Sequence, residues 1–433
     1  MRISGPTDRR GVTAPAAGRW SAGRARPRVL FLATSYPVYE GAAEGVFVAR
    51  LAESLIPFVR VLVLAPCPPA AAKRSPRARG RKRVRVVCLR YAPARLRLLA
   101  QGPGGIPASL ARRPWLWVLV PALLWAMFVG ARRALRGACL LHAHWAVCGA
   151  VGGLAARLRG RPVVTTLRGE DVNRAARSFV HRLVLRACVA LSSRVVVVSE
   201  ALAQRVRRLV QAADPIVIPN GVGPEFFELD PPSRGDHFEV LFIGSLIPRK
   251  RPDLLVEALR TVPGARLTLL GDGPERPHLE SMARAEGLSR RVRFMGQVAP
   301  ERVLEYLSSA EAVVVSSERE GRPNALLEAM AAGRAVVVSD FDGAAEVVED
   351  GVSGLMFPRG DADALAARLR SLQEDPAMVR RLGQAARARM RSLGLRWEDT
   401  AARYARLYEE LLSEHGGAAG EDGMERGGRN GAA

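Results

Sequence analysis

Glu320 and Glu328, with seven residues between them, are the side chains whose type and spacing most directly suggest chemistry. They lie around a predicted helix start, which follows a turn at Ser316–Pro323 and an apolar run typical of a buried strand, Ala312–Val315. The first N–H groups of a helix bind anions, and Gly321 lets a ligand approach the backbone closely. Carboxylates accept hydrogen bonds from neutral hydroxyls. The pattern therefore predicts a ligand with both phosphate and sugar hydroxyls, that is, a nucleotide-sugar.

Each glutamate also has a simpler explanation. Negative charge is favoured near a helix N-terminus, and Glu328 would suit a solvent-exposed helix face. However, the E-x7-E pattern, with Gly321 and Pro323 just after its first Glu and LLEAMAAGRAVVVSD beyond it, resembles the donor-site signature of retaining glycosyltransferases of family 4. The resemblance is strong from about residue 194 to 390 and weaker before. It implies the α/β fold called GT-B, in which two Rossmann-like domains face each other across a cleft.

The resemblance assigns donor binding to the second domain. Two cations, Arg249 and Lys250, follow a strand and precede a helix. They would hold the diphosphate together with the backbone amides of residues 321–324, because fixed cations offset the negative charge of a leaving group. Glu328 would hold the ribose and Glu320 a sugar hydroxyl. The expected donor-binding residues, among which Ser245 replaces an arginine common in relatives, are Gly45, Gly244, Ser245, Val298, Gly321, Arg322, Pro323, Asn324, Glu328 and Glu346.

The resemblance assigns the acceptor to the first domain, where His144 and Trp145 would line the cleft. Arg168 stands where many relatives have a histidine that contacts the donor sugar near the reacting carbon. Arg168 would then act electrostatically or through its backbone carbonyl, and it joins Arg249, Lys250 and Glu320 as a catalytic candidate. Asp171 and Asn173 either cap the following helix or contact the acceptor or the sugar.

No metal or other cofactor is expected. His142 and His144 alone are too few for a metal site. Asp340 and Asp342 form an Asp-x-Asp, which binds divalent metals in other glycosyltransferase folds. In this chain, arginine, lysine and a helix N-terminus already supply positive charge, so we interpret the Asp-x-Asp as incidental.

The composition indicates two soluble domains with an unusual charge. The chain has 433 residues, 48% of them hydrophobic, and a net charge of +23. Such a charge favours nucleic acid, an anionic membrane or a phosphorylated substrate as partner. No zinc-finger spacing or aromatic-basic motif appears and the basic residues are spread through the chain, so we expect no nucleic-acid partner.

Five scattered cysteines without a Cys-x-x-Cys pair predict reduced thiols and a cytoplasmic protein.

Alternating strand and helix patterns divide the chain. We predict a disordered basic tail at 1–27, a first domain at 28–218, a linker at 219–236, a nucleotide-sugar domain at 237–394 and a disordered tail at 414–433. In the resembled fold, the helical segment 395–413 crosses back to the first domain.

The most apolar stretch, residues 115–129, contains three tryptophans and lies between Arg112–Arg113 and Arg132–Arg133. It is shorter than the roughly 20 residues that a bilayer span needs. It is therefore either a buried crossover helix or a helix that lies in a membrane interface, peripheral to the inner face of the cytoplasmic membrane.

The sequence thus predicts a retaining transferase that moves a hexosyl unit from a nucleoside diphosphate sugar to a saccharide or polyprenyl-linked acceptor in envelope or exopolysaccharide synthesis. One alternative is a nucleotide-sugar 2-epimerase of the same architecture, which would need acid and base groups near the sugar C2. A less favoured alternative is a basic nucleic-acid-binding protein.

Overall fold

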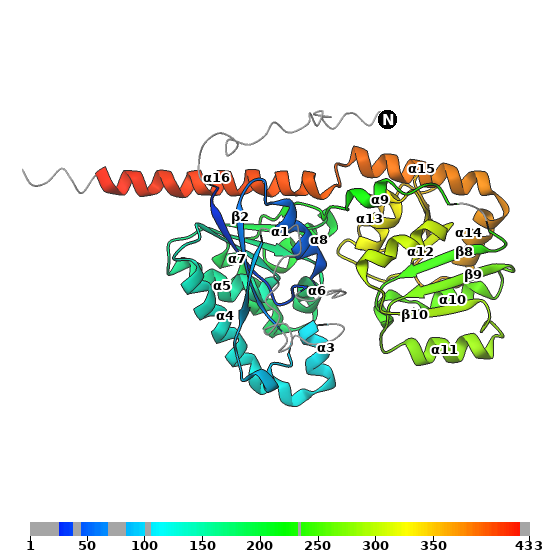
Figure 1. Cartoon of the computed structure of the whole chain (residues 1–433), viewed down its shortest axis with the longest axis horizontal. Coiled ribbons are helices and arrows are strands. Elements are labelled where there is room, and N and C mark those ends of the chain that lie inside the picture. Colours follow the sequence, from blue (N-terminus) through cyan, green and yellow to red (C-terminus); the bar gives the residue numbers. More distant parts are fainter. Residues whose placement is uncertain (1–25, 38–44, 68–83, 100–104, 233–234, 425–433) are drawn as a thin grey trace, which may run out of the picture.

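Two parallel sheets form the framework of the molecule, and helices pack against both (Figure 1). The computed structural model describes residues 26–37, 45–67, 84–99, 105–232 and 235–424. The strands are short and mostly buried; β11, for example, is AVVV with every residue buried. Apolar runs of this kind form strands that are covered on both faces. The predicted α/β architecture is confirmed.

The first sheet has seven strands in the order β3-β2-β1-β4-β5-β6-β7. They are β1 (Arg28–Leu32), β2 (Arg60–Pro66), β3 (Arg85–Leu89), β4 (Leu140–His144), β5 (Val163–Leu167), β6 (Arg194–Val197) and β7 (Ile216–Val217). Its helices are α1 (Val46–Ser54), η2 (Ala94–Leu96), α3 (Gly105–Arg112), η3 (Pro114–Leu119), α4 (Val120–Ala134), α5 (Ala146–Arg157), α6 (Glu170–Arg177), α7 (Phe179–Leu191) and α8 (Glu200–Leu209).

The second sheet has six strands in the order β10-β9-β8-β11-β12-β13. They are β8 (Phe238–Ile243), β9 (Ala265–Leu270), β10 (Val292–Gly296), β11 (Ala312–Val315), β12 (Ala335–Ser339) and β13 (Leu355–Phe357). The helices that precede and surround it are α9 (Pro224–Phe227), η4 (Pro248–Lys250), α10 (Asp253–Leu259), α11 (Arg276–Ala285), η5 (Pro300–Arg302), α12 (Val303–Ser309), α13 (Asn324–Ala331), η6 (Ala344–Glu346), α14 (Ala362–Glu374) and α15 (Pro376–Ser392).

Strand order reverses once in each sheet, between β1 and β4 and between β8 and β11. In open α/β sheets, ligands bind beyond the carboxyl ends of the strands at such a switch point. The loops after β8 and β11 carry Arg249, Lys250 and Glu320. The topology therefore brings together residues that lie about 70 positions apart in the chain.

The last helix, α16 (Trp397–Met424), leaves the second domain and packs on the first (Figure 1). Tyr404, Tyr408 and Leu411 share one hydrophobic cluster with Val29 and Phe31 of β1. The helix continues beyond residue 413, so the tail predicted from 414 onwards begins inside a helix. The rest of that tail (425–433), most of the predicted amino-terminal tail (1–25) and residues 233–234 of the predicted linker lie outside the described residues.

The expectation that all five cysteines are reduced thiols was wrong for two of them. Cys67 and Cys88 form a disulfide, whereas Cys139, Cys148 and Cys188 are free. Strands β2 and β3 pair in parallel, with Ala65 opposite Cys88. Cys67 follows two residues after Ala65, just after the end of β2, and therefore lies close to Cys88. The spacing of 21 residues in sequence gave no sign of this pairing.

The tryptophan-rich stretch belongs to a longer helical segment that is only partly buried. Helices η3 and α4 are continuous over Pro114–Ala134, which is long and apolar enough to cross a membrane by length and composition alone. Leu123, Met127 and Ala131 face the core, but Trp117 is 60% and Trp125 67% exposed. The stretch is thus a crossover helix with one buried face and one exposed apolar face.

Candidate functional site

The three predicted residues Arg249, Lys250 and Glu320 meet at the switch point of the second sheet. Lys250 Nζ lies 3.1 Å and Arg249 Nη1 3.3 Å from the same oxygen, Glu320 Oε1. Ser317 Oγ donates a hydrogen bond of 3.0 Å to it. Burial alone would raise the pKa of Glu320, but Lys250 and then Arg249 act against this, and the net result is a lowered pKa. Glu320 is therefore an ionised acceptor beside two cations.

Glycine backbones leave room for this cluster. A Cβ atom on Gly244 would lie 3.1 Å from Lys250 Nζ, and one on Gly271 would clash with the Gly244 carbonyl. A side chain at residue 244 would therefore push Lys250 away from its place. Ser245, the next residue, is exposed, and its side chain has no partner among the described residues.

Helix α13 presents its N-terminus next to this cluster. It begins at Asn324, directly after Pro323, and Glu328 lies one turn further on. The Glu328 carboxyl forms no hydrogen bond or ion pair with any residue that the structure describes. Burial raises the pKa of Glu328 to about 7, against a lowering by Arg50 and with a further increase from Glu225. Glu328 is thus a half-buried carboxyl that is available to accept hydrogen bonds from hydroxyl groups.

The two domains touch at a pair of glycines. A Cβ atom on Gly321 would lie 2.6 Å from the carbonyl oxygen of Arg168, and one on Gly169 would lie 3.1 Å from the Gly321 Cα. Gly169 also has a φ of 113°, which side chains rarely adopt. The loops after β5 and β11 can approach this closely only because both positions are glycine.

Arg168 links the first domain to the N-terminal end of α13. Its Nη1 donates to Asn220 Oδ1 at 2.6 Å, and the Asn220 amide donates to Asn324 Oδ1 at 2.9 Å. Its Nη2 lies 3.4 Å from His144 Nδ1, and its guanidinium carbon lies 4.1 Å above the ring of Phe47. Burial lowers the pKa of Arg168 to about 10, so the side chain stays protonated at neutral pH.

His144 does not line an open cleft as expected, because its side chain is fully buried. Its ring lies 4.3 Å from that of His142, whose Nδ1 and Nε2 contact Tyr408 and Thr166. Tyr404 joins the same network through Thr166 Oγ1 at 2.8 Å. Burial lowers the pKa of both histidines. The crossing-back helix thus supports the strand beneath Arg168.

Asp171 stabilises its own loop. Its carboxylate accepts hydrogen bonds from four backbone N–H groups, those of Ala146, Arg168, Gly169 and Val172. This matches the capping alternative. Burial raises the pKa of Asp171, against the lowering effect of these four bonds.

Asn173, Arg322 and Glu346 take part in contacts between the domains. Arg205 on α8 donates to both Asn173 Oδ1 and Asp342 Oδ2. Glu346 accepts from the backbone N–H groups of residues 200 and 201 at the start of α8, and from Arg322 Nη2 at 2.9 Å. In this arrangement the Glu346 carboxylate has a full set of partners, so its predicted contact with the donor sugar stays a prediction.

Gly45, Trp145 and Val298 occupy the positions expected of loop residues at the sheet edges. Gly45 precedes α1 with a φ of 75°, and a Cβ there would lie 2.5 Å from the Ser35 carbonyl oxygen. Trp145 is a non-glycine residue with a φ of 72° and packs against Phe47. Val298 is partly buried and packs against a hydrophobic cluster of the second domain. Their predicted ligand contacts stay predictions.

The two carboxylates of the Asp-x-Asp pair with arginines. Asp340 accepts from Arg359 at 3.1 Å and Asp342 from Arg205 at 2.6 Å. Among the described residues, no group of three histidine, cysteine, aspartate or glutamate side chains is placed to hold a metal ion.

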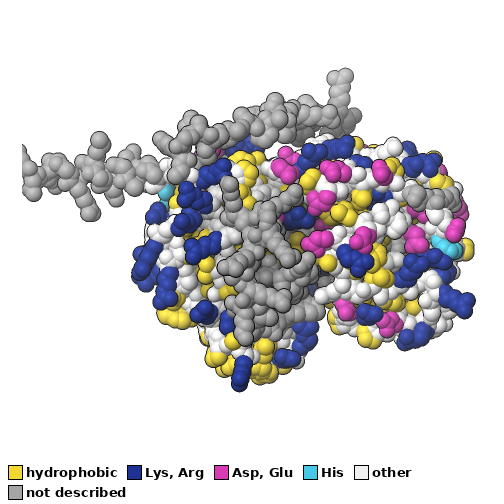
Figure 2. All heavy atoms as spheres, in the orientation of Figure 1, with side chains coloured by type: hydrophobic (Ala, Val, Ile, Leu, Met, Phe, Trp, Pro, Cys, Tyr) yellow, Lys and Arg dark blue, Asp and Glu magenta, His cyan; other side chains and the backbone are white. Residues whose placement is uncertain are grey.

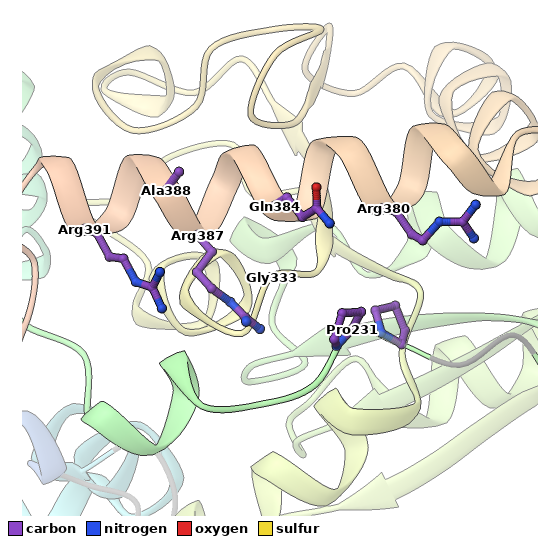
Figure 3. A pocket seen from close by; sticks show the side chains of 8 residues that line it. Pro231, Gly333, Arg380, Gln384, Arg387, Ala388 and Arg391 are labelled. Carbon is purple, nitrogen blue, oxygen red and sulfur yellow. The ribbon is translucent and has the colours of Figure 1, made fainter.

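A separate hollow lies at the other end of α13, just beyond the end of that helix (Figure 3). Arg387 on α15 crosses it and donates to the carbonyls of Ala331 and Ala332. None of the predicted donor or acceptor residues lines this hollow, which is formed by Pro231, Pro232, Gly333, Arg380, Gln384, Arg387, Ala388 and Arg391.

Two sequence profiles match the chain in succession. The profile described as Glycosyltransferase Family 4 matches residues 45–226, and the one described as Glycosyl transferases group 1 matches residues 226–389. Together they span most of the chain. The chain belongs to the family 4 glycosyltransferases. The second profile contains every residue of the cluster at α13.

Curated relatives of this glycosyltransferase match it over part of their length. An uncharacterised glycosyltransferase, MJ1178 of Methanocaldococcus jannaschii, is 26% identical over 64% of this chain and 76% of its own. The lipopolysaccharide core biosynthesis glycosyltransferase LpsD of Rhizobium meliloti is 34% identical over 43% of this chain and 55% of its own. The match to LpsD therefore covers little more than half of that relative.

Solved structures share the fold of the glycosyltransferase. A sucrose-phosphate synthase from Thermosynechococcus elongatus is 25% identical, covers 90% of this chain and all of its own, and has a TM-score of 0.76. HepE of Anabaena in complex with UDP-glucose is 21% identical, covers 88% of this chain and 99% of its own, and has a TM-score of 0.68. The predicted GT-B fold is confirmed.

Several residues at the site of the glycosyltransferase were not found from the sequence. They are Asn220, Arg205, Tyr404 and Tyr408. In the sequence, Asn220 and Gly221 resemble a turn and also an interdomain junction, and the tyrosines form part of a helical pattern. None of them lies in a local motif, because their partners are 32 to 266 residues away, so only the folded chain reveals them.

Proposed function

We propose that this glycosyltransferase moves a hexosyl unit from a nucleoside diphosphate sugar to a saccharide or lipid-linked acceptor, with retention of configuration. The observation that carries the proposal is the convergence of Arg249, Lys250 and Glu320 beside the N-terminus of α13, with the unpartnered Glu328 one turn further on. The neighbour HepE was solved with UDP-glucose, which supports a donor of this class. LpsD, whose name refers to lipopolysaccharide core synthesis, supports a saccharide acceptor.

In the proposed reaction, Arg249, Lys250 and the first amides of α13 bind the diphosphate. Their positive charge stabilises the charge that develops on the leaving oxygen, and no metal is needed for this role. Glu328 accepts hydrogen bonds from the ribose and Glu320 accepts one from the sugar. The acceptor hydroxyl attacks the anomeric carbon from the face that the diphosphate leaves, and its proton passes to the departing phosphate oxygen. Contact between Gly169 and Gly321 closes the two loops over the site and excludes water.

The test is a panel of UDP-, GDP- and ADP-sugars measured by thermal stabilisation of the wild type and Glu328→Ala. A ligand that binds the native state raises its melting temperature. We expect one nucleotide class to stabilise the wild type and to lose this effect in Glu328→Ala, but not in Glu305→Ala on α12, which serves as control. If no donor stabilises the folded wild type, the proposal fails.

Turnover separates transfer from epimerisation. A transferase releases nucleoside diphosphate only with an acceptor present, and NMR of the product would show the retained anomeric configuration. Conversion of the donor to its 2-epimer without any acceptor would favour the epimerase instead.

We further propose that η3 and α4 dock the enzyme on the inner, cytoplasmic face of an anionic membrane; the Cys67–Cys88 disulfide removes reduced thiols as an argument for this location. Trp115, Trp117, Val118 and Trp125 are all more than half exposed. No Asp or Glu occurs between Glu53 and Glu170, whereas arginines lie on both sides of the tryptophans. Figure 2 shows dark blue Lys and Arg side chains over the first domain and magenta acidic side chains gathered on the second. Aromatic rings beside basic residues suit a membrane interface.

Replacement of Trp115, Trp117 and Trp125 by serine is expected to abolish flotation with vesicles that contain anionic lipid. Exposed tryptophans supply most of the apolar area in this contact, so their loss removes the apolar part of binding. The control is Met295→Ser, an exposed apolar residue on the second sheet. Unchanged flotation of the triple variant would remove the proposed docking surface.

A further inference from the structure

Charged side chains where the two domains meet occur mostly as opposite pairs. Arg249 and Lys250 pair with Glu320, and Arg322 pairs with Glu346. Further contacts between the domains pair Arg205 with Asp342 and Arg50 with Glu225. Each of these cations thus has a carboxylate within 4 Å.

Arg168 differs from these residues. In the part of the chain that the structure describes, no carboxylate lies within ion-pair distance of its guanidinium, and its hydrogen-bond partners are the neutral Asn220 and His144. Asp171 is nearby, but its carboxylate is occupied by four backbone N–H groups. Moving a charge out of water without a partner costs several kcal/mol of effective free energy. Arg168 is such a charge, and it lies where the loop after β5 touches Gly321 of the second domain.

The guanidinium retains capacity to bind. It has five N–H donors, of which two are used by Asn220 and His144. Its Nε is buried and has no partner, and neither has the neighbouring His144 Nε2. Arg334 also has unsatisfied buried atoms, so what distinguishes Arg168 is its place where the two domains touch. The planar guanidinium suits an oxyanion, carboxylate or phosphate, better than any other group.

Arg168 reaches the N-terminal end of α13 from the first domain. Its carbonyl touches Gly321, and Asn220 connects its side chain to Asn324 at the head of that helix. Arg168 belongs to the first domain, whereas Arg249 and Lys250, which we assign to the diphosphate, belong to the second. A substrate between the domains would meet the two cationic groups from different sides.

We propose that Arg168 binds an oxyanion carried by the transferred sugar or by the acceptor, separate from the donor diphosphate. This inference rests on the proposed function, since it names the substrate class for the same site. The oxyanion has two sources: the carboxylate of a uronic acid in the donor, or a phosphate on the acceptor.

The donor arm of the test compares UDP-glucuronic acid with UDP-glucose in calorimetric titrations of wild type, Arg168→Gln and Arg168→Lys. If the donor carries the carboxylate, the wild type prefers the acidic donor at least about 30-fold, since loss of one partner of a buried charge pair typically costs 2 kcal/mol or more. Arg168→Gln abolishes the preference and Arg168→Lys keeps part of it. Arg174→Gln, at an exposed arginine of α6 paired with Glu170, leaves it unchanged.

The acceptor arm measures KM for a saccharide linked to a polyprenyl diphosphate and for the same saccharide on an uncharged alkyl chain. If the acceptor carries the oxyanion, Arg168→Gln raises KM for the phosphorylated acceptor much more than KM for the uncharged one. The proposal is overturned if the wild type prefers the anionic substrate in neither arm, or if Arg168→Gln weakens neutral and anionic substrates equally. If neutral donors still bind and react in that case, the proposed function stands without this inference. If no donor binds, whether acidic or neutral, the proposed function is refuted as well.

Discussion

Lys250→Ala is expected to lower kcat by about 10²–10³-fold, the size typical for loss of one preorganised charge at a leaving group. Lys250 Nζ and Arg249 Nη1 converge on one oxygen of Glu320, so both cations lie at the point assigned to the diphosphate. Negative charge on the diphosphate grows as the bond to the sugar breaks. An ammonium fixed there therefore contributes more to the transition state than to substrate binding. Steady-state kinetics with the donor identified by thermal stabilisation would measure the effect.

The division between kcat and KM makes this prediction specific. A cation that acted only in donor binding would raise KM and leave kcat unchanged. Lys250→Arg keeps the charge and should recover much of the rate, whereas Arg260→Ala, at an exposed arginine that pairs with Glu286, should behave as wild type. A fall in kcat of less than about threefold in Lys250→Ala would contradict the assignment of Lys250 to the leaving group.

The sequence was informative where neighbours in space are also neighbours in a motif. The strand run Ala312–Val315, the turn after it and the helix from Asn324 follow from local periodicity, and the topology then brings Arg249 and Lys250 to Glu320. These residues follow two strands that are neighbours in a parallel sheet. Once the fold class is predicted correctly, their meeting at the carboxyl edge of that sheet follows almost directly.

The sequence was uninformative where one side chain had several possible partners. The sequence did not reveal that Glu346 accepts hydrogen bonds at the start of α8, about 145 residues away, and its predicted contact with the sugar stays a prediction. His144 was expected in the cleft, but burial in β4 places it beneath Arg168. A carboxylate or an imidazole is equally suited to a ligand, a helix end or a buried network, and only tertiary packing decides among them.

Glu328→Gln is expected to stabilise the protein while it weakens donor binding. The pKa of Glu328 is raised to about 7 by burial, from a model-peptide value near 4.5. Between these two pH values the folded state holds a proton that the unfolded state has released. Stability therefore falls as pH rises through this window and stays reduced above about 7. Glutamine has no charge to bury, so the variant escapes this loss.

Each unit of pKa shift corresponds to about 1.36 kcal/mol of stability, and the partial exposure of the carboxyl reduces this effect. We therefore expect the free energy of unfolding of Glu328→Gln to exceed that of the wild type by about 1–3 kcal/mol at pH 8 and by little at pH 4. Denaturant unfolding of wild type and Glu328→Gln at both pH values would measure it. Equal differences at the two pH values would contradict the raised pKa. Glu305→Gln, at the exposed partner of Arg302, is the control and should show no such gain.

The same carboxyl should make donor binding depend on pH in the opposite direction. Hydrogen bonds from ribose hydroxyls are stronger to an ionised carboxylate than to a neutral acid. Donor affinity should therefore rise about tenfold from pH 6 to pH 8, and binding near pH 7 should release a proton from Glu328. Calorimetry in two buffers with different ionisation enthalpies would detect that proton, and Glu328→Gln would release none. Burial thus makes Glu328 costly in the unliganded protein, and the donor offsets this cost by supplying the hydroxyls that the surrounding residues do not.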